Sequence, residues 1–305
     1  MRQKLAFFVI FLFGYLPLSV ARFLGYCVAK ILTWLPKNSL HFVTRRNIEL
    51  TNPLKSTEEI KKLVNKSIVN TIQVAFEMPV IWKRSNTWLN RKITSIENEN
   101  LLRQAVAENR GVIVLCPHIG NWEVFGRKLA EFAPTTNLYQ PPKLKFMESL
   151  VLRGRESSGA RLVPTSHRGM NALLKALRSG EITGILPDQQ PETDRGLFVP
   201  FFGVPAYTMN LIYSLVQKTN CNVVLGYAIR ERAGFKIIFK SVHPEIFSED
   251  KLDSLVALSK AVEASLEEDP TQYQWAYKRF RKQPDDFRPY KPILSEEDLS
   301  RFNRY

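Results

Sequence analysis

Hydrophobic residues in the second half of the chain form short runs that alternate with stretches of helical spacing. Apolar, β-branched runs predict buried strands, and apolar residues repeating every three or four positions predict amphipathic helices. The predicted strands cover residues 112–116, 136–139, 161–164, 182–186 and 223–229. The predicted helices cover residues 122–132, 144–156, 169–178, 208–218 and 251–268. This alternation is typical of a mostly parallel sheet covered by helices, so we expect an α/β fold.

One further strand is predicted by a hairpin pattern. Residues 235–242 alternate apolar and polar positions directly after Ala233 and Gly234. This pattern predicts that 235–242 pairs antiparallel with 223–229 at an edge of the sheet. The expected sheet is therefore mixed, although mostly parallel.

Helices are predicted before the first strand. Residues 40–50 read as a helix with basic positions, and residues 57–84 form a long amphipathic pattern that starts with a capping sequence. We expect a helical region at 37–99 that packs on a core at about 100–282. Together they form one domain over residues 37–305.

The N-terminal segment is strongly apolar. Residues 5–21 carry no charge, a length near the lower limit for a membrane-spanning helix. Residues 19–21 would suit signal-peptide cleavage, but the apolar pattern continues to Trp34, which favours retention. Pro17 interrupts the run, so a spanning helix and a helix lying in the membrane surface both stay open. We expect residues 1–36 to form an N-terminal membrane anchor.

The net charge of the chain limits the classes of molecule that it is expected to bind. Lysine and arginine number 43 against 29 acidic residues, which gives a net charge of +14. Such a charge favours binding to nucleic acid, to an anionic membrane or to an acidic substrate. The basic residues are scattered and no RNP-like, zinc-finger or basic-zipper pattern occurs, so we expect no nucleic acid.

The cysteines give no sign of disulfides. Cys27, Cys116 and Cys221 lie far apart in or beside apolar runs, which favours a reducing compartment. Cys116 stands two residues before His118, which leaves a covalent Cys–His mechanism as an alternative. No spacing of Cys, His and Asp matches a metal site, and no cofactor is expected.

A histidine and a glutamate follow the strand at 112–116 and form the main catalytic candidate. Pro117 ends the strand, Gly120 permits a tight turn, and Asn121 is a good N-cap for the next helix. On one helix, residues five apart diverge by about 140°, so His118 and Glu123 would not share a metal.

At a strand end and in the first turn of the following helix, the same two side chains can approach each other. The Glu123 carboxylate would then hold one imidazole nitrogen of His118 and leave the other nitrogen free as a general base. Such a base can take a proton from a hydroxyl as it attacks a carbonyl.

Segments 118–123 resemble the His-x4-Glu/Asp box of membrane lipid acyltransferases, in the variant of the lipid A late acyltransferases. Other blocks resemble that family in its order along nearly the whole chain, at 45–48, 153–159, 186–189, 201–206 and 275–280. The resemblance implies a glycerolphosphate-acyltransferase-like fold. It also implies transfer of a fatty acyl chain from acyl carrier protein to a hydroxyl of a hydroxyacyl chain on a Kdo-lipid A precursor.

The resemblance has further implications for place and partners. It places the catalytic domain on the cytoplasmic face of the inner membrane of a Gram-negative cell, in contact with membrane lipids. A glycerophospholipid acyltransferase with the same His-acid pair is one alternative. A non-enzymatic, basic, membrane-anchored binding protein is another.

Other site candidates come from the remaining blocks. Arg155 and Arg153 would hold a phosphate or stabilise an oxyanion, or would only complement the end of a helix. Asp188 follows a strand, where it would fix Arg155 or the substrate or form a turn. Asn121 is a further candidate for substrate binding or for the oxyanion. Arg45, Arg46 and Asn47 are candidates for a headgroup site or for packing, and Phe202 and Gly203 for a substrate region or a plain turn. Thr208 is expected to cap the helix that follows them.

Overall fold

The computed structural model describes residues 10–35, 38–52, 54–142, 147–192, 194–285 and 287–291. The described helices are α2 (Leu18–Thr33), α3 (Ser39–Thr51), α4 (Thr57–Lys83), α5 (Asn86–Asn90), α6 (Glu99–Ala107), α7 (Trp122–Leu129), α8 (Glu148–Glu156), α9 (His167–Arg178), α10 (Leu211–Thr219), η2 (Pro244–Phe247), α11 (Lys251–Ser265) and η3 (Pro270–Gln272). The described strands are β1 (Ile93–Glu97), β2 (Val112–Leu115), β3 (Thr136–Tyr139), β4 (Arg161–Pro164), β5 (Ile182–Ile185), β6 (Gly196–Phe201), β7 (Val204–Met209), β8 (Asn222–Arg230) and β9 (Phe235–Lys240).

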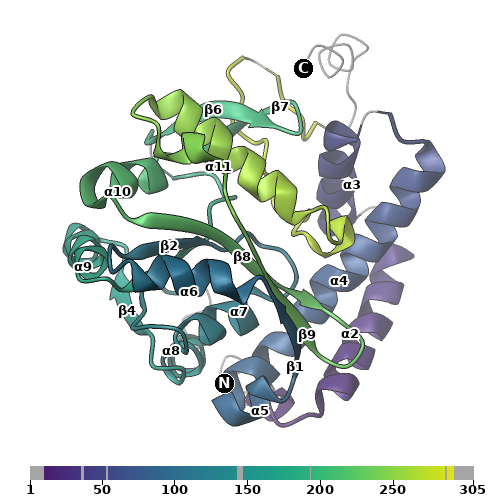
Figure 1. The fold of residues 1–305 in the computed structure, drawn as a ribbon. Coiled ribbons are helices and arrows are strands. Elements are labelled where there is room, and N and C mark those ends of the chain that lie inside the picture. Colours follow the sequence, from purple (N-terminus) through teal and green to yellow (C-terminus); the bar gives the residue numbers. More distant parts are fainter. Residues whose placement is uncertain are drawn as a thin grey trace.

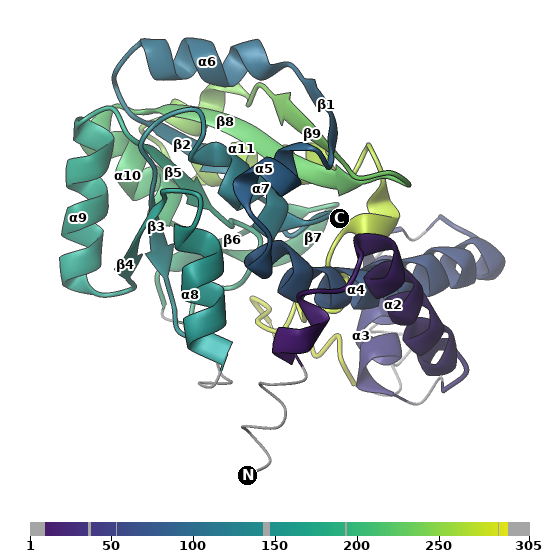
Figure 2. The same ribbon diagram turned by 90° about the horizontal axis from the view of Figure 1, so that it is seen from below.

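A five-stranded sheet in the order β1-β9-β8-β2-β5 lies at the centre of the fold (Figures 1 and 2). β2 pairs parallel with both β8 and β5, and β1 pairs parallel with β9, whereas β8 and β9 run antiparallel. β3 and β4 pair parallel beside β5, and β6 and β7 form an antiparallel hairpin. The expected mixed, mostly parallel sheet flanked by helices is confirmed.

Strand β2 is buried on both faces of the sheet. Ile113 and Leu115 belong to the core that α9, α10 and α11 cover, whereas Val112 and Val114 belong to the core that α6 and α7 cover. All four side chains are fully buried. Burial on both faces explains why the strand reads as a continuous apolar run.

The five predicted strands at 112–116, 136–139, 161–164, 182–186 and 223–229 are confirmed within one residue at each end. The antiparallel pairing of β9 with β8 is also confirmed, but the expected edge position of β9 is wrong. β1 pairs with its other side. β1 was not predicted because Thr94, Ser95 and Glu97 are exposed and leave no apolar run.

The helix expected at 208–218 is wrong at its start, because the chain continues as strand β7 to Met209 and α10 begins at Leu211. Thr208 is buried in the strand and is not a helix cap. Phe202 and Gly203 form the β6–β7 turn, with positive φ angles of 48° and 79°. Their turn role is therefore structural, and their contact with a substrate stays a prediction.

Helix α4 joins the N-terminal helices to the sheet. It starts at a reciprocal capping box between Ser56 and Glu59, as its sequence predicts. It packs against α2 and α3 and also against α7 and α8. Figures 1 and 2 both show α2, α3 and α4 as a group beside the sheet.

The apolar run at 5–21 is not one continuous helix where it is described. The chain turns at 14–16, and Pro17 directly precedes α2. Residues 1–9 lie outside the described part. Among the described residues, no helix combines the length and the apolar character needed to cross a bilayer.

Candidate active site

His118 lies where β2 gives way to α7. Gly120 adopts a φ of +56°, and a Cβ added there would lie 1.9 Å from the carbonyl oxygen of Ala228, so only glycine fits this turn. The Asn121 side chain accepts a hydrogen bond from the Val124 amide at 3.1 Å and caps α7. The predicted strand, tight turn and capped helix are confirmed.

The carboxylate that contacts the imidazole belongs to Asp188. Asp188 Oδ1 lies 2.7 Å from His118 Nδ1, and Oδ2 accepts a hydrogen bond from the His118 backbone amide at 2.9 Å. β5 is one of the two parallel neighbours of β2, so residues directly after β2 and β5 meet at the same edge of the sheet. Because Asp188 accepts from Nδ1, the neutral ring presents Nε2 as a hydrogen-bond acceptor.

Glu123 does not take the position that the sequence predicts. Its carboxylate accepts hydrogen bonds from Trp82 Nε1 at 2.8 Å, and from Arg155 Nε and Nη2 at 3.0 and 2.5 Å. It faces α4 and α8, which pack against α7, instead of the imidazole. The predicted contact between Glu123 and the His118 ring is thus replaced by Asp188, while a role for Glu123 in catalysis stays a prediction.

The other edge of the imidazole faces polar side chains. Gln189 Nε2 lies 3.2 Å from His118 Nε2 and donates to Gln274 Oε1 at 3.3 Å. The Trp122 ring packs against the imidazole edge with 5.0 Å between centroids. The His118 side chain is 12% exposed.

The Asp188 carboxylate is kept ionised in a buried position. Burial raises its pKa, but the nearby His118 ring, its hydrogen bonds and the charge of Arg279 outweigh this effect, so the pKa lies below its ordinary value. Arg279 is itself buried and donates to the Tyr207 carbonyl and to Thr208 Oγ1, both at 2.7 Å. Asp188 therefore fixes His118, and not Arg155 as one interpretation of the sequence proposed.

Glu123 holds only part of the Arg155 guanidinium, through Nε and Nη2. Burial lowers the pKa of its guanidinium, but the Glu123 charge and hydrogen bonds outweigh this and raise it, so the group stays cationic. Nη1 has no hydrogen-bond partner among the described residues, and the side chain is 34% exposed. Arg153, in the same last turn of α8, is exposed and forms no side-chain pair with the described part of the chain.

A buried carboxylate that the sequence analysis did not single out contacts the turn that carries His118. Glu77 of α4 is fully buried and accepts from Arg22 Nε at 2.7 Å, Arg230 Nε at 2.7 Å and Asn121 Nδ2 at 2.9 Å. The two arginines lower its pKa despite the burial that raises it. Asn121 therefore has a structural place between the turn and α4.

The basic cluster on α3 divides into surface and packing residues. Arg45 pairs with Glu49 on the surface at 2.7 Å, and Arg46 donates to the Lys291 carbonyl at 3.3 Å. Asn47 is buried and donates to the carbonyls of Trp275 and Tyr277 at 2.7 and 2.6 Å. Asn47 thus supports packing of the 275–280 segment.

Cys116 lacks the surroundings of a reactive thiol. Its Sγ donates to the Val114 carbonyl at 3.3 Å, and burial raises the pKa of the thiol well above its usual range. Among the described residues, no group of three or more His, Cys, Asp or Glu side chains is arranged to hold a metal ion.

A small apolar cavity of about 80 Å³ opens beside Glu123 and Arg155. Its walls come from α7, α8, β3, β4 and β5, and they include Trp122, Gly126 and Leu162. A Cβ added to Gly126 would meet no atom within 4 Å, so the absence of a side chain there keeps part of this space open.

Comparisons with known proteins agree over nearly the full chain. The sequence model described as bacterial lipid A biosynthesis acyltransferase matches residues 3–282. Lipid A biosynthesis palmitoleoyltransferase of Escherichia coli strain K12 is 26% identical over 279 residues, which cover 90% of each chain. Lipid A biosynthesis lauroyltransferase of the same organism is 25% identical over 283 residues, covering 91% of this chain and 90% of the relative. A lipid A biosynthesis acyltransferase of Haemophilus influenzae is 23% identical over 279 residues, covering 90% of this chain and 88% of the relative.

Proposed function

Because the chain belongs to the family of bacterial lipid A biosynthesis acyltransferases, we propose that it is a late acyltransferase acting on a Kdo-lipid A precursor. The donor would be acyl carrier protein carrying the acyl chain, and the acceptor a hydroxyl of a hydroxyacyl chain already on the lipid. The observation that carries the proposal is the His118 imidazole with Nδ1 held by Asp188 and Nε2 facing the Gln189 amide, which a substrate hydroxyl can replace.

The reaction follows from that geometry. An acceptor hydroxyl replaces the Gln189 amide at His118 Nε2 and gives its proton to the ring as the oxygen attacks the thioester carbonyl. Asp188 stabilises the imidazolium that forms. The intermediate collapses, the carrier thiolate leaves, and the imidazolium returns the proton to it. No covalent acyl-enzyme is formed.

Arg155 and Glu123 take a second role. Glu123 holds the guanidinium by two hydrogen bonds and leaves Nη1 to face an anionic group of a substrate or the developing oxyanion. The apolar cavity beside this pair suits part of the acyl chain. On this proposal Glu123 acts through Arg155.

The alternatives fit these features less well. A glycerophospholipid acyltransferase would use the same base, but the family match over residues 3–282 favours lipid A. A basic binding protein without activity would not require an imidazole whose Nδ1 is held by a buried carboxylate.

The N-terminal helix supports a place at the membrane. Large apolar side chains of α2 and of its C-cap residue repeat at helical spacing and are exposed. They are Phe23 (64% exposed), Ile31 (64%) and the C-cap Trp34 (84%). We propose that this face of α2 lies in the membrane surface, with the catalytic domain on the cytoplasmic side of the inner membrane. N-terminal sequencing and protease treatment of spheroplasts test this. A chain starting at Arg22, or digestion of the catalytic domain from outside, would contradict it.

The function is tested by mass spectrometry. Lipid A from cells lacking the protein should lose one or more secondary acyl chains, and the wild-type gene should restore them. The purified protein should transfer an acyl chain from acyl carrier protein to the precursor, and His118→Ala should not. Unchanged lipid A in the deletion strain, together with no transfer in vitro, would reject the proposal.

A further inference from the structure

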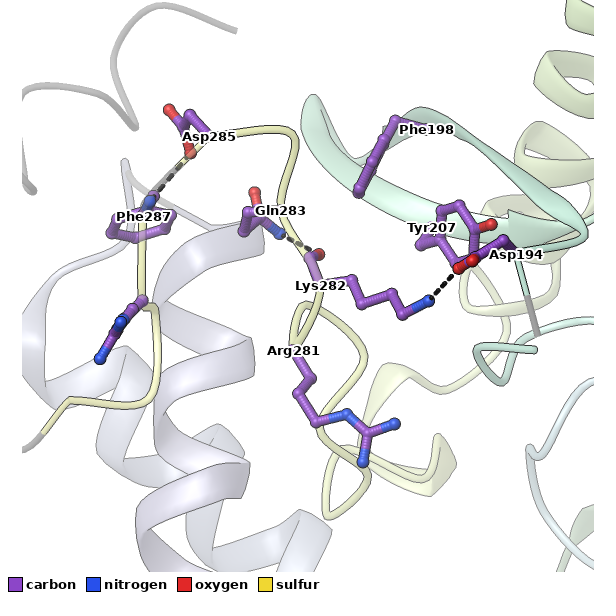
Figure 3. A pocket seen from close by; sticks show the side chains of 9 residues that line it. Asp194, Phe198, Tyr207, Arg281, Lys282, Gln283, Asp285 and Phe287 are labelled. Atoms are coloured by element: carbon purple, nitrogen blue, oxygen red, sulfur yellow. Dashed lines mark hydrogen bonds and ion pairs between the residues drawn. The ribbon is translucent and has the colours of Figure 1, made fainter. Parts of the chain in front are cut away.

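A second cavity, larger than the one at Glu123, lies between the β6–β7 hairpin and the chain that follows Arg279. Its volume is about 440 Å³, within the range of pockets that hold small ligands. Figure 3 shows Phe198 and Tyr207 on the hairpin side, and Lys282 reaching from the opposite segment toward Asp194 and Tyr207.

The walls of this cavity combine aromatic faces, cations and two carboxylates, Asp194 and Asp285. The rings of Phe198 and Tyr207 lie 5.1 Å apart, and Lys282 Nζ lies 4.6 Å from the Tyr207 ring centre. The Arg281 guanidinium has no partner among the described residues. Lys282 pairs with Asp194 at 3.2 Å, but the Asp194 side chain is fully exposed, so an ion pair of this kind contributes little and exchanges readily.

This composition indicates the class of ligand. Aromatic faces pack against the C–H faces of sugar rings, and a guanidinium binds phosphate or carboxylate oxygens through paired hydrogen bonds. The Gln283 amide is held by the Pro205 and Phe280 carbonyls at 3.0 and 3.1 Å, and its oxygen stays available to a sugar hydroxyl. An acidic sugar uses all three kinds of group at once.

The cavity is joined to the catalytic site by short chain segments. Asp188 and Asp194 are six residues apart, so their Cα atoms are separated by at most roughly 20 Å. Tyr207, whose ring lines the cavity, accepts at its carbonyl from Arg279, the residue whose charge favours ionised Asp188. A large ligand can therefore occupy the cavity and the His118 site together.

We infer that this cavity binds an acidic sugar, bearing phosphate or carboxylate, of the lipid acceptor. The inference rests on the proposed function and adds the group by which the acceptor is held. Arg281 and Lys282 bind the acid group, and Phe198 and Tyr207 pack against the sugar ring. The headgroup is then anchored while the hydroxyl to be acylated reaches His118.

The test compares Arg281→Ala/Lys282→Ala with two matched variants. Arg281→Lys/Lys282→Arg keeps both charges, and Lys61→Ala/Lys62→Ala removes the same charge from the exposed first turns of α4. The alanine pair should raise KM for the acceptor by about tenfold per lost cation, while KM for the acyl carrier protein donor changes by less than about twofold. The charge-keeping pair should restore most of the affinity.

The acid group is identified with trimmed acceptors. An acceptor without the carboxylate-bearing sugar and an acceptor without its phosphates are each compared with the full acceptor. The increase in acceptor KM caused by Arg281→Ala/Lys282→Ala should be smaller for the acceptor that lacks the acid group bound in the cavity. Three results would overturn the inference. They are an increase in acceptor KM that is unchanged with both trimmed acceptors, an increase in donor KM alone, and no change in either KM.

Binding of the deacylated, phosphorylated disaccharide is measured in parallel by calorimetry. The wild-type protein should bind it and the alanine pair should bind it about tenfold more weakly or worse. This measurement tests sugar binding by the cavity independently of acyl transfer. A failure to transfer an acyl chain to lipid A precursors would reject the proposed function and not the binding of a sugar. Equal binding by both proteins would reject the cavity as the sugar site.

Discussion

Asp188 contacts His118 twice, at the ring Nδ1 and at the backbone amide, with distances of 2.7 and 2.9 Å. The carboxylate thus orients the ring and holds the turn that carries it. No other carboxylate among the described residues contacts this imidazole, so the two acids of the region, Asp188 and Glu123, have separable roles.

Asp188→Asn should lower turnover by up to roughly 10⁴-fold, because an amide favours the tautomer in which Nε2 carries the proton. Steady-state acyl transfer measures this. The variant should stay folded by circular dichroism, since an amide is nearly isosteric. A folded Asp188→Asn protein with near-normal turnover would show that Asp188 is not the orienting acid.

Glu123→Gln should act mainly on stability and on Arg155. Because the Arg155 side chain is 34% exposed, removing the charge of Glu123 should lower the free energy of unfolding by less than the about 3 kcal/mol of a fully buried pair. Arg155→Ala should lower turnover by roughly 10²-fold if Nη1 meets the developing oxyanion. If Glu123→Gln matched the loss of Asp188→Asn while its unfolding free energy was unchanged, Glu123 would be the catalytic carboxylate after all.

Cys116→Ser should keep most of its turnover, because the thiol is buried and its pKa is raised. Chelators should have no effect on the rate. Intact-protein mass spectrometry during turnover should detect no added acyl group. An acylated protein that disappears in Cys116→Ser would establish the covalent route.

Glu77→Gln should lower the free energy of unfolding by about 3 kcal/mol at pH 7, because Arg22 and Arg230 stay buried without their counter-charge. The folded-state pKa of Glu77 lies below its ordinary value, so the contribution of Glu77 to stability is present above that ordinary value and is lost as the pH falls through the lower folded pKa. Denaturant unfolding at several pH values should therefore show the difference between wild type and variant shrinking as the pH falls below the ordinary carboxyl pKa of about 4. A difference that stays constant with pH would contradict this account.

Gly126→Leu should shift donor preference toward shorter acyl chains, because the new side chain enters the cavity beside Glu123. Gly126→Ala should show a smaller shift and raise stability by up to about 1 kcal/mol, as alanine is the better helix former. Competition between acyl carrier proteins with different chains measures the preference. An unchanged preference in a folded Gly126→Leu protein would remove this cavity from the acyl path.

The parts of the site that follow local rules could be predicted from the sequence. Pro117, Gly120 and Asn121 set a turn whose geometry depends only on neighbouring residues. The contact between His118 and Asp188 depends on which strand lies beside β2, and no local pattern carries that information. The Glu77 network joins segments more than 150 residues apart, and its one sequence signal is a carboxylate among the apolar positions of α4.

The same distinction explains the errors in the fold. Strands buried on both faces, such as β2, are marked by their composition. β1 is stabilised by pairing along one side of β9, and Thr208 continues a hairpin, so both depend on partners distant in the chain.

The burial of Arg22 has a practical consequence for preparing a water-soluble form of the enzyme. Cutting the chain at residue 36 would remove α2 and its exposed apolar face. It would also remove Arg22, a counter-ion of Glu77, and Glu77 holds Asn121 at the start of α7. Solubility is better sought by replacing Phe23, Ile31 and Trp34 with polar residues. The outward side of the helix would then change while the side that supports the reaction centre stays intact.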